Sequence, residues 1–248
     1  MSQASVLRSL HVPGSPLVLP NVWDAATARI VERAGFPAIA TSSAAVGGSL
    51  GPGDGERMTA EEAFAAIARV TAVVSVPVTA DVEAGYGLEP RILVDRLLAA
   101  GAVGCNLEDT ERPSGELGSP EQVAARIAAV RAAAGDEVVI NARADSFARG
   151  HPEARRDAIE RGRRYLDAGA DCVYPITASD EADIAALIDA LGVININLGA
   201  RSPPLARLAQ LGVARVSLAG GLFRFMTRQV STAVAALRDG DDGAFREE

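Results

Sequence analysis

Two carboxylates follow one apolar segment of the chain, in VPVTADVEAGYG from Val76 to Gly87. The apolar alternation before Asp81 is typical of a buried strand, and the glycines around Tyr86 indicate a sharp turn after it. The strand therefore delivers Asp81 and Glu83 to one surface. Hard cations prefer oxygen ligands of this kind. Because acids also favour helix starts, an N-cap aspartate beside a solvated glutamate is the alternative interpretation.

Other predicted strands also end in polar side chains. These residues are Ser42 and Ser43 with Asp54 on the loop after them, Asn106 and Glu108, Arg143, and Asn195 with Asn197. Acids that converge from neighbouring strands would repel one another unless a cation lay among them. The sequence therefore favours a Mg²⁺ or Mn²⁺ site with all-oxygen ligands, formed by Asp81, Asp54, Glu83 and Glu108.

Arg143 ends a predicted strand next to the one that carries Glu108. A guanidinium there suits a two-pronged hold on a substrate carboxylate or phosphonate. The alternative is that Arg143 is only the counter-ion of Glu108. Asn106 and Asn195 are further candidates for substrate binding, because each shares the inward parity of its strand.

The elements that position these residues alternate regularly along the chain. Eight short apolar strands, beginning with Leu17–Asn21, are separated by helices, and six helices are expected to stop at glycine: Gly35, Gly101, Gly135, Gly169, Gly192 and Gly212. Helix starts are predicted at Asp24, Thr59 and Ser119, and a long glycine-rich loop is predicted from Ser43 to Met58. Together these features predict an α/β fold, a single (β/α)₈ barrel over residues 1–248. An open doubly wound sheet is the runner-up, although no Gly-x-Gly-x-x-Gly follows the first strand.

Composition excludes several classes of function. The 24 basic and 32 acidic side chains give a net charge of −8, and lysine is absent, so no basic face for nucleic acid is expected. The two cysteines, Cys105 and Cys172, lie in apolar runs and are expected in the core. Without a leader sequence or an apolar run of about 20 residues, no membrane contact is expected and a cytoplasmic location is predicted.

Several of these segments resemble the isocitrate lyase and phosphoenolpyruvate mutase superfamily. NVWDAATARIVERAGFPAIATSS resembles its first β-α-β unit, DVEAGYG its DxDxGYG metal signature, NLED its fourth-strand acid and NARAD its substrate arginine strand. The resemblance implies a barrel whose last helix is exchanged with a neighbouring subunit, and a Mg²⁺ site with Asp81 as the direct ligand. It also implies that Asp54, Glu83 and Glu108 act through water, and that Ser42, Ser43 and Arg143 hold a 2-oxo acid.

The departures from the family pattern bear on the reaction. The loop after the fourth strand, DTERPSGELG, lacks the lyase Lys-Lys-Cys-Gly-His, and it does not provide the mutases' set of a Lys, an Asn and a Ser, because it contains no Lys and no Asn. The leading hypothesis is a Mg²⁺-dependent lyase that cleaves the carbon–carbon bond next to a 2-oxo acid through an enolate, as in oxaloacetate decarboxylation. Glu108 and Arg143 would serve catalysis, and Tyr86 or water would donate the proton. The alternatives are a phosphonopyruvate hydrolase or a phosphoenolpyruvate or carboxyvinyl-carboxyphosphonate mutase, and a non-catalytic barrel that binds 2-oxo acids.

The predicted terminal helix, Leu222 to Leu237, is more apolar than an outer helix of a barrel requires. Its apolar residues include Phe223, Phe225 and Val230. We therefore expect it to pack on a second subunit, which gives a homodimer or homotetramer by helix exchange.

Overall fold

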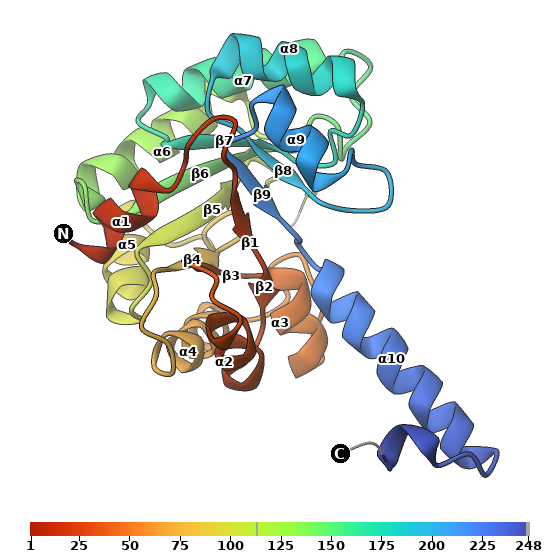
Figure 1. Cartoon of the computed structure of the whole chain (residues 1–248). Coiled ribbons are helices and arrows are strands. Elements are labelled where there is room, and N and C mark those ends of the chain that lie inside the picture. The colour runs from red at the N-terminus through yellow and green to blue at the C-terminus, as the bar shows by residue number, and fades with distance from the viewer. Residues whose placement is uncertain (113, 247–248) are drawn as a thin grey trace.

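The computed structural model of this protein describes residues 1–112 and 114–246. Its strands run parallel and form the wall of a barrel (Figure 1). The strands are β1 (Leu17–Leu19), β2 (Asn21–Val22), β3 (Ile39–Thr41), β4 (Val78–Asp81), β5 (Gly104–Glu108), β6 (Val139–Ala144), β7 (Cys172–Pro175), β8 (Asn195–Asn197) and β9 (Arg215–Ser217).

The barrel wall consists of two hydrogen-bonded sheets, β1-β9-β8 and β2-β3-β4-β5-β6-β7. At one junction β1 continues directly into β2, so the first predicted strand, Leu17–Asn21, is divided at Pro20, which has no N–H for the ladder. At the other junction a parallel bridge joins Val173 to Ile194, which links β7 to the segment that enters β8. The predicted parallel α/β barrel is confirmed.

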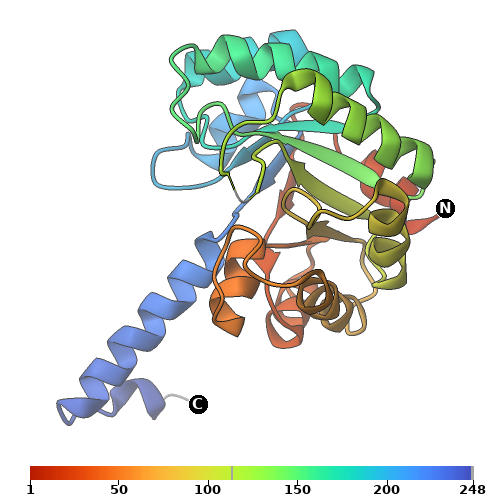
Figure 2. The ribbon, with the colours of Figure 1, turned by 180° about the vertical axis from the view of Figure 1, so that it is seen from behind.

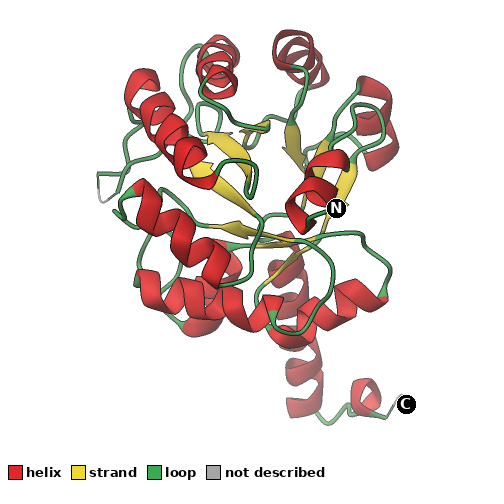
Figure 3. Cartoon of the chain, turned by 90° about the vertical axis from the view of Figure 1, so that its left-hand side faces the viewer, coloured by secondary structure: helices red, strands yellow, loops and turns green. Residues whose placement is uncertain are grey.

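Helices surround the strands, as the view in Figure 3 shows. They are α1 (Gln3–Ser9), α2 (Ala25–Arg33), α3 (Ser43–Leu50), α4 (Ala60–Thr71), α5 (Pro90–Ala99), α6 (Pro120–Ala134), α7 (Ala154–Asp167), α8 (Glu181–Leu191), α9 (Leu205–Leu211) and α10 (Gly221–Arg238), with a short 3₁₀ turn, η1 (Gly243–Phe245).

The predicted helix boundaries follow from local chemistry. The Asp24 side chain accepts a hydrogen bond from the Thr27 backbone N–H at the start of α2, and Thr59 and Glu62 form a capping box at the start of α4. At the start of α6 the Ser119 hydroxyl accepts from the Gln122 N–H at 3.2 Å. The six predicted glycine stops all have positive φ, a conformation that other residues adopt only with strain: Gly35, Gly101, Gly135, Gly169, Gly192 and Gly212.

The predicted loop from Ser43 to Met58 is wrong in its first half, which forms α3. The Ser42 hydroxyl caps this helix by accepting from the Ala45 N–H at 3.3 Å. Glycine at the middle of a helix is unfavourable by about 1 kcal/mol, and this made the segment look like a loop. Packing explains why glycine is needed: a Cβ on Gly47 would lie 2.2 Å from the Gly53 carbonyl oxygen.

Apolar side chains fill the space between the strands and the outer helices, and Cys105 and Cys172 are buried there or in the wall as predicted. Inside the barrel, Leu7 of α1, Leu17, Leu19 and Val139 form an apolar cluster toward the N-terminal ends of the strands, and polar side chains lie above it. Asn106 Oδ1 accepts hydrogen bonds from Asn141 Nδ2 at 2.7 Å and from Arg215 Nη2 at 3.1 Å, all three side chains being buried. This polar layer supports the C-terminal ends of the strands from below.

Helix α10 leaves the barrel and projects away from it in both Figure 1 and Figure 2. Its first turns contact the body, where Phe223 lies edge-to-face against Trp23 with ring centroids 5.1 Å apart. Four large apolar side chains along the helix are exposed: Phe225, Val230, Val234 and Leu237. In the part of the chain that the structure describes, no helix is both long and apolar enough to cross a membrane.

Candidate active site

A pocket with a volume of about 240 Å³ opens where the barrel strands end. Six of the predicted site residues line it: Ser42, Ser43, Asp54, Asp81, Asn106 and Arg143. The other four, which are Glu83, Tyr86, Glu108 and Asn195, lie beside or beneath it and do not form its wall. The structure therefore brings six of the ten predicted residues into one wall and leaves the other four next to it.

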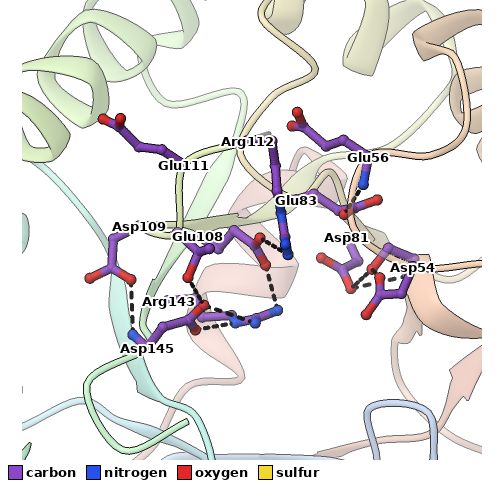
Figure 4. A network of polar contacts seen from close by, with 12 residues as sticks. Asp54, Glu56, Asp81, Glu83, Glu108, Asp109, Glu111, Arg112, Arg143 and Asp145 are labelled. Carbon is purple, nitrogen blue, oxygen red and sulfur yellow. Dashed lines mark hydrogen bonds and ion pairs between the residues drawn. The ribbon is translucent and has the colours of Figure 1, made fainter. Parts of the chain in front are cut away.

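Asp81 at the end of β4 and Asp54 on the loop after α3 lie close together (Figure 4), and both contact Ser43. The Ser43 hydroxyl is 2.9 Å from Asp81 Oδ2 and 2.9 Å from Asp54 Oδ1, and the Ser43 N–H donates to Asp81 Oδ2 at 3.1 Å. Burial raises the pKa of Asp81, and the charge of Asp54 raises it further. One hydroxyl proton can serve only one of the two acids, so this pair attracts a cation or a proton.

Glu83 turns away from the pocket toward the loop that carries Glu56 (Figure 4). Its carboxylate accepts from the Glu56 N–H at 2.6 Å and from the Tyr86 hydroxyl at 3.1 Å. Glu56, Glu83 and Tyr86 all have positive φ, an uncommon conformation that this mutual bonding holds in place. Burial and the charge of Asp81 raise the pKa of Glu83 to about 7. The Tyr86 hydroxyl is thus engaged with Glu83, and it does not point into the pocket as a proton donor would.

Arg143 holds two buried acids at the end of β6. Its Nη1 lies 2.6 Å from Glu108 Oε2, and its Nε and Nη2 lie 2.6 and 3.0 Å from the two oxygens of Asp145. The loop after β5 adds Arg112, whose Nη2 donates to Glu108 Oε1 at 3.0 Å. Burial raises the pKa of Glu108 to about 8 even though Arg143 opposes the shift. The counter-ion interpretation of Arg143 therefore describes a real contact, and the same guanidinium also lines the pocket.

The structure does not bring the four predicted metal ligands together as one group. Across residues 1–112 and 114–246, no three Asp, Glu, His or Cys side chains are close enough to hold a metal by themselves. Asp54 and Asp81 form one pair, while Glu83 and Glu108 are turned toward protein donors (Figure 4). The oxygen-only donors and the two mutually repelling aspartates fit a hard cation that keeps part of its water shell.

Asn106 and Asn195 occupy different levels of the barrel. Two donors fix Asn106 Oδ1 in the interior, which leaves its amide nitrogen to face the pocket. Asn195 is fully buried and donates to Ser217 Oγ at 3.2 Å, so it lies below the pocket floor. Asn106 is placed to contact a ligand, and Asn195 is placed to support the floor.

Residues from the C-terminal half of the chain complete the pocket and were missed from the sequence. They are Tyr174 and Thr177 near the end of β7, and Arg224 on α10. The Tyr174 ring is buried beside Ser217, and its hydroxyl makes no hydrogen bond of normal geometry to any described residue. Burial raises the pKa of Tyr174 to about 12, so it stays protonated. One signal in the sequence could have found Tyr174. It lies two residues after Cys172 on β7, so the two side chains point to the same side of the strand.

Comparison with known proteins places the chain in a family. Residues 7–238 match the model of phosphoenolpyruvate phosphomutase. A 2-methylisocitrate lyase of Escherichia coli is 32% identical over 226 residues, which cover 82% of this chain and 72% of that protein. An uncharacterized protein of Mycobacterium tuberculosis is 35% identical over 94% of this chain and 88% of its own length. The phosphoenolpyruvate phosphomutase from Streptomyces platensis has a TM-score of 0.85 at 27% identity, covering 97% of this chain and 89% of that one. The chain therefore belongs to the phosphoenolpyruvate phosphomutase family, within the superfamily that its motifs resemble.

Proposed function

We propose that the protein is a Mg²⁺-dependent lyase that cleaves the C3–C4 carbon–carbon bond of a 2-oxo acid, so that an enolate forms at C2 and C3. The observation that carries this proposal is the pair of aspartates in the pocket wall, Asp81 and Asp54, which share one serine hydroxyl. Membership in a family that contains 2-methylisocitrate lyase supports carbon–carbon cleavage as the reaction class.

Asp81 would hold the cation directly, with Asp54 acting through water. A bound Mg²⁺ supplies charge neutralisation where an oxygen becomes negative during bond cleavage. Glu83 and Glu108 lie behind this position, where burial raises their pKa values to about 7 and about 8, and a bound cation would shift both toward their charged forms. Their contacts with Glu56 and Arg112 keep them in place.

The chain's own residues orient the acid. The Ser42 hydroxyl and the Asn106 amide nitrogen face the pocket as donors for a carboxylate and a keto oxygen, and the Ser43 hydroxyl would join them once a cation takes its place beside Asp81 and Asp54. Arg143 adds a positive charge at the same wall. These groups are held by hydrogen bonds to the barrel before a ligand arrives, so little reorganisation is needed when negative charge develops.

Oxaloacetate decarboxylation is the simplest reaction of this class. The C3–C4 bond breaks, its electron pair moves toward the keto group to form an enolate, CO₂ leaves, and C3 then takes a proton to give pyruvate. This reaction needs no base at a substrate hydroxyl, which suits a loop after β5 that contains no Cys, Lys or His in Asp109–Gly118. The protonated Tyr174 hydroxyl and solvent are the available proton donors near the pocket.

The test is a panel of oxaloacetate, phosphonopyruvate and 2-methylisocitrate, assayed with Mg²⁺ and with EDTA by release of pyruvate or succinate. We expect Mg²⁺-dependent pyruvate formation from oxaloacetate above the rate with the metal alone, and loss of that rate in Asp81→Asn. No acceleration over the metal background, or faster turnover of phosphonopyruvate or 2-methylisocitrate, would contradict the proposal. Oxalate binding without any turnover would instead support a barrel that only binds 2-oxo acids.

A further inference from the structure

Arg215 on β9 is a fully buried guanidinium inside the barrel. It points to the same side of its strand as Ser217, which lines the pocket, so it lies one layer below the pocket floor. Its Nη2 donates to Asn106 Oδ1 at 3.1 Å, whereas Nε and Nη1 make no hydrogen bond to any described residue. Burial of a charged group that is only partly bonded is unfavourable for folding, so this arginine indicates a role in function.

The groups around Arg215 leave its charge uncompensated. None of the ion pairs within residues 1–112 and 114–246 includes it. Burial raises the pKa of Cys172 and that of Tyr174 to about 12, and burial lowers the pKa of His11 to about 4, so these three neighbours are neutral at pH 7. Burial lowers the pKa of Arg215, and the charge of Asp81 in the pocket wall opposes this shift. Arginine stays protonated, so a positive charge lies below the pocket and can act on an anion bound there.

Asn106 links Arg215 to the pocket. Its Oδ1 accepts from Arg215 and, at 2.7 Å, from Asn141 Nδ2, which uses both lone pairs of this oxygen. The amide nitrogen therefore faces the pocket, where Asn106 is the strand partner of Asp81. A flipped amide would place its NH₂ group against a guanidinium that can only donate, so Arg215 excludes that orientation.

We propose that Arg215 is a positioning residue for the reaction: it holds the Asn106 amide with its nitrogen toward the ligand, and its charge strengthens that donor. The inference rests on the proposed function, because it assumes that the 2-oxo acid binds beside Asp81 and Asn106. It adds to that function a residue that acts from below the pocket without touching the substrate.

The charge of Arg215 favours one stage of the reaction over another. A cation at Oδ1 polarises the Asn106 amide, so its N–H bonds more strongly to an oxygen that carries negative charge than to a neutral one. The enolate oxygen gains more from this than the keto oxygen from which it forms. Arg215 therefore lowers the barrier to bond cleavage and does not merely tighten substrate binding.

The experiment compares oxalate with pyruvate. Both carry one carboxylate, but oxalate presents a negatively charged oxygen where pyruvate presents a neutral keto oxygen. Their dissociation constants are measured by calorimetry with Mg²⁺ for the full-length protein, for Arg215→Gln and for Arg215→Met, a second neutral replacement of similar length. The kcat and KM for oxaloacetate are measured in parallel by release of pyruvate.

Two further variants separate the role of Arg215 from a general effect on the barrel. Asn106→Ala, alone and combined with Arg215→Gln, shows whether Arg215 acts through Asn106. Arg131→Gln is the matched control. Arg131 is a half-buried arginine that donates to the Gly169 and Val138 carbonyl oxygens, each at 2.9 Å, before β7 and β6 begin, and it does not line the pocket.

We expect Arg215→Gln and Arg215→Met to weaken oxalate binding about tenfold and pyruvate binding less than about threefold. Both should lower kcat for oxaloacetate about tenfold and change KM less than about threefold. In the Asn106→Ala background, Arg215→Gln should have no further effect on oxalate. Arg131→Gln should leave both dissociation constants and kcat unchanged.

Equal losses for oxalate and pyruvate, or no loss for either, would overturn the role of Arg215 and leave the proposed function standing. A further loss of about tenfold in the Asn106→Ala background would also overturn it, because Arg215 would then act without Asn106. If neither neutral variant folds, Arg215 is required for the structure and the inference fails. Failure of oxalate and pyruvate to bind to the unaltered protein would overturn the proposed function and the inference together.

Discussion

Replacement of Arg143 by lysine tests how the acids around the pocket are held. Arg143 makes three charged contacts of 2.6, 2.6 and 3.0 Å to Glu108 and Asp145, whose side chains are each 2% exposed. A lysine keeps the charge but reaches one acid at a time, so at least two charged hydrogen bonds are lost. At about 1.5 kcal/mol each, the expected fall in the free energy of unfolding is roughly 3 kcal/mol.

The free energy of unfolding would be measured by urea titration, with the slope checked for two-state behaviour. The matched control is Arg91→Lys, because Arg91 Nε also bonds both oxygens of an aspartate, Asp95, but at an exposed site. The control should change stability by less than about 0.5 kcal/mol. A loss below about 1 kcal/mol in Arg143→Lys would refute the reasoning that this guanidinium stabilises the buried acids.

The same variant separates the two roles of Arg143. If its guanidinium also grips the substrate, oxalate affinity should fall by about 1.5 kcal/mol or more, which is roughly tenfold in Kd. An unchanged Kd together with the loss of stability would assign Arg143 to the support of Glu108 and Asp145 alone.

Three further predictions concern the metal, the pH dependence and the assembly. Asp81→Asn should abolish Mg²⁺-dependent oxalate binding in calorimetry, since an amide is a poor ligand for a hard cation; unchanged affinity in the presence of EDTA would contradict this. Burial and the charge of Arg215 lower the pKa of His11 to about 4. The folded protein therefore loses stability as the pH falls from 6.5 toward 4, by at most roughly 3 kcal/mol, because the unfolded chain binds a proton at His11 first. Between pH 7.5 and pH 5, the urea midpoint of His11→Gln should fall less than that of the unaltered protein. The exposed apolar face of α10 should cover a second copy of the chain, so sedimentation should give a species larger than 25.6 kDa, and Val230→Asp with Val234→Asp should give a folded monomer; a monomer before mutation would contradict helix exchange.

Much of the fold could be predicted because its boundaries depend on neighbouring residues in the sequence. Caps such as Thr59 with Glu62, and glycine stops such as Gly169, act within one turn of a helix. Helix α3 could not be predicted in this way. Its glycines are unfavourable locally, and the contact between Gly47 and Gly53 becomes visible only when the chain folds back on itself.

The candidate site also depends partly on contacts between sequence neighbours and partly on contacts that only the fold creates. Strand parity and strand ends were enough to bring Asp81, Asn106 and Arg143 to one pocket. The orientation of Glu83 depends on the backbone N–H of Glu56, a contact that spans 27 residues, and sequence spacing does not encode it. The wall from Tyr174 to Arg224 comes from segments that carry no acidic motif, so a search for metal ligands passed over them.

Among the described residues, helix α10 is held to the body at its base, where Phe223 lies against Trp23 and against Gly48 of α3. The helix is a rod about 27 Å long that is fixed at one end, at about 1.5 Å for each of its 18 residues. A tilt of about 10° at the base moves the outer end of the helix by roughly 5 Å. A contact made at the outer end therefore restricts this tilt far more than the same contact made near the barrel. A contact on the outer turns of α10 therefore limits the mobility of Arg224 and of the start of α3. The mobility of the pocket wall thus depends on a contact made well away from it.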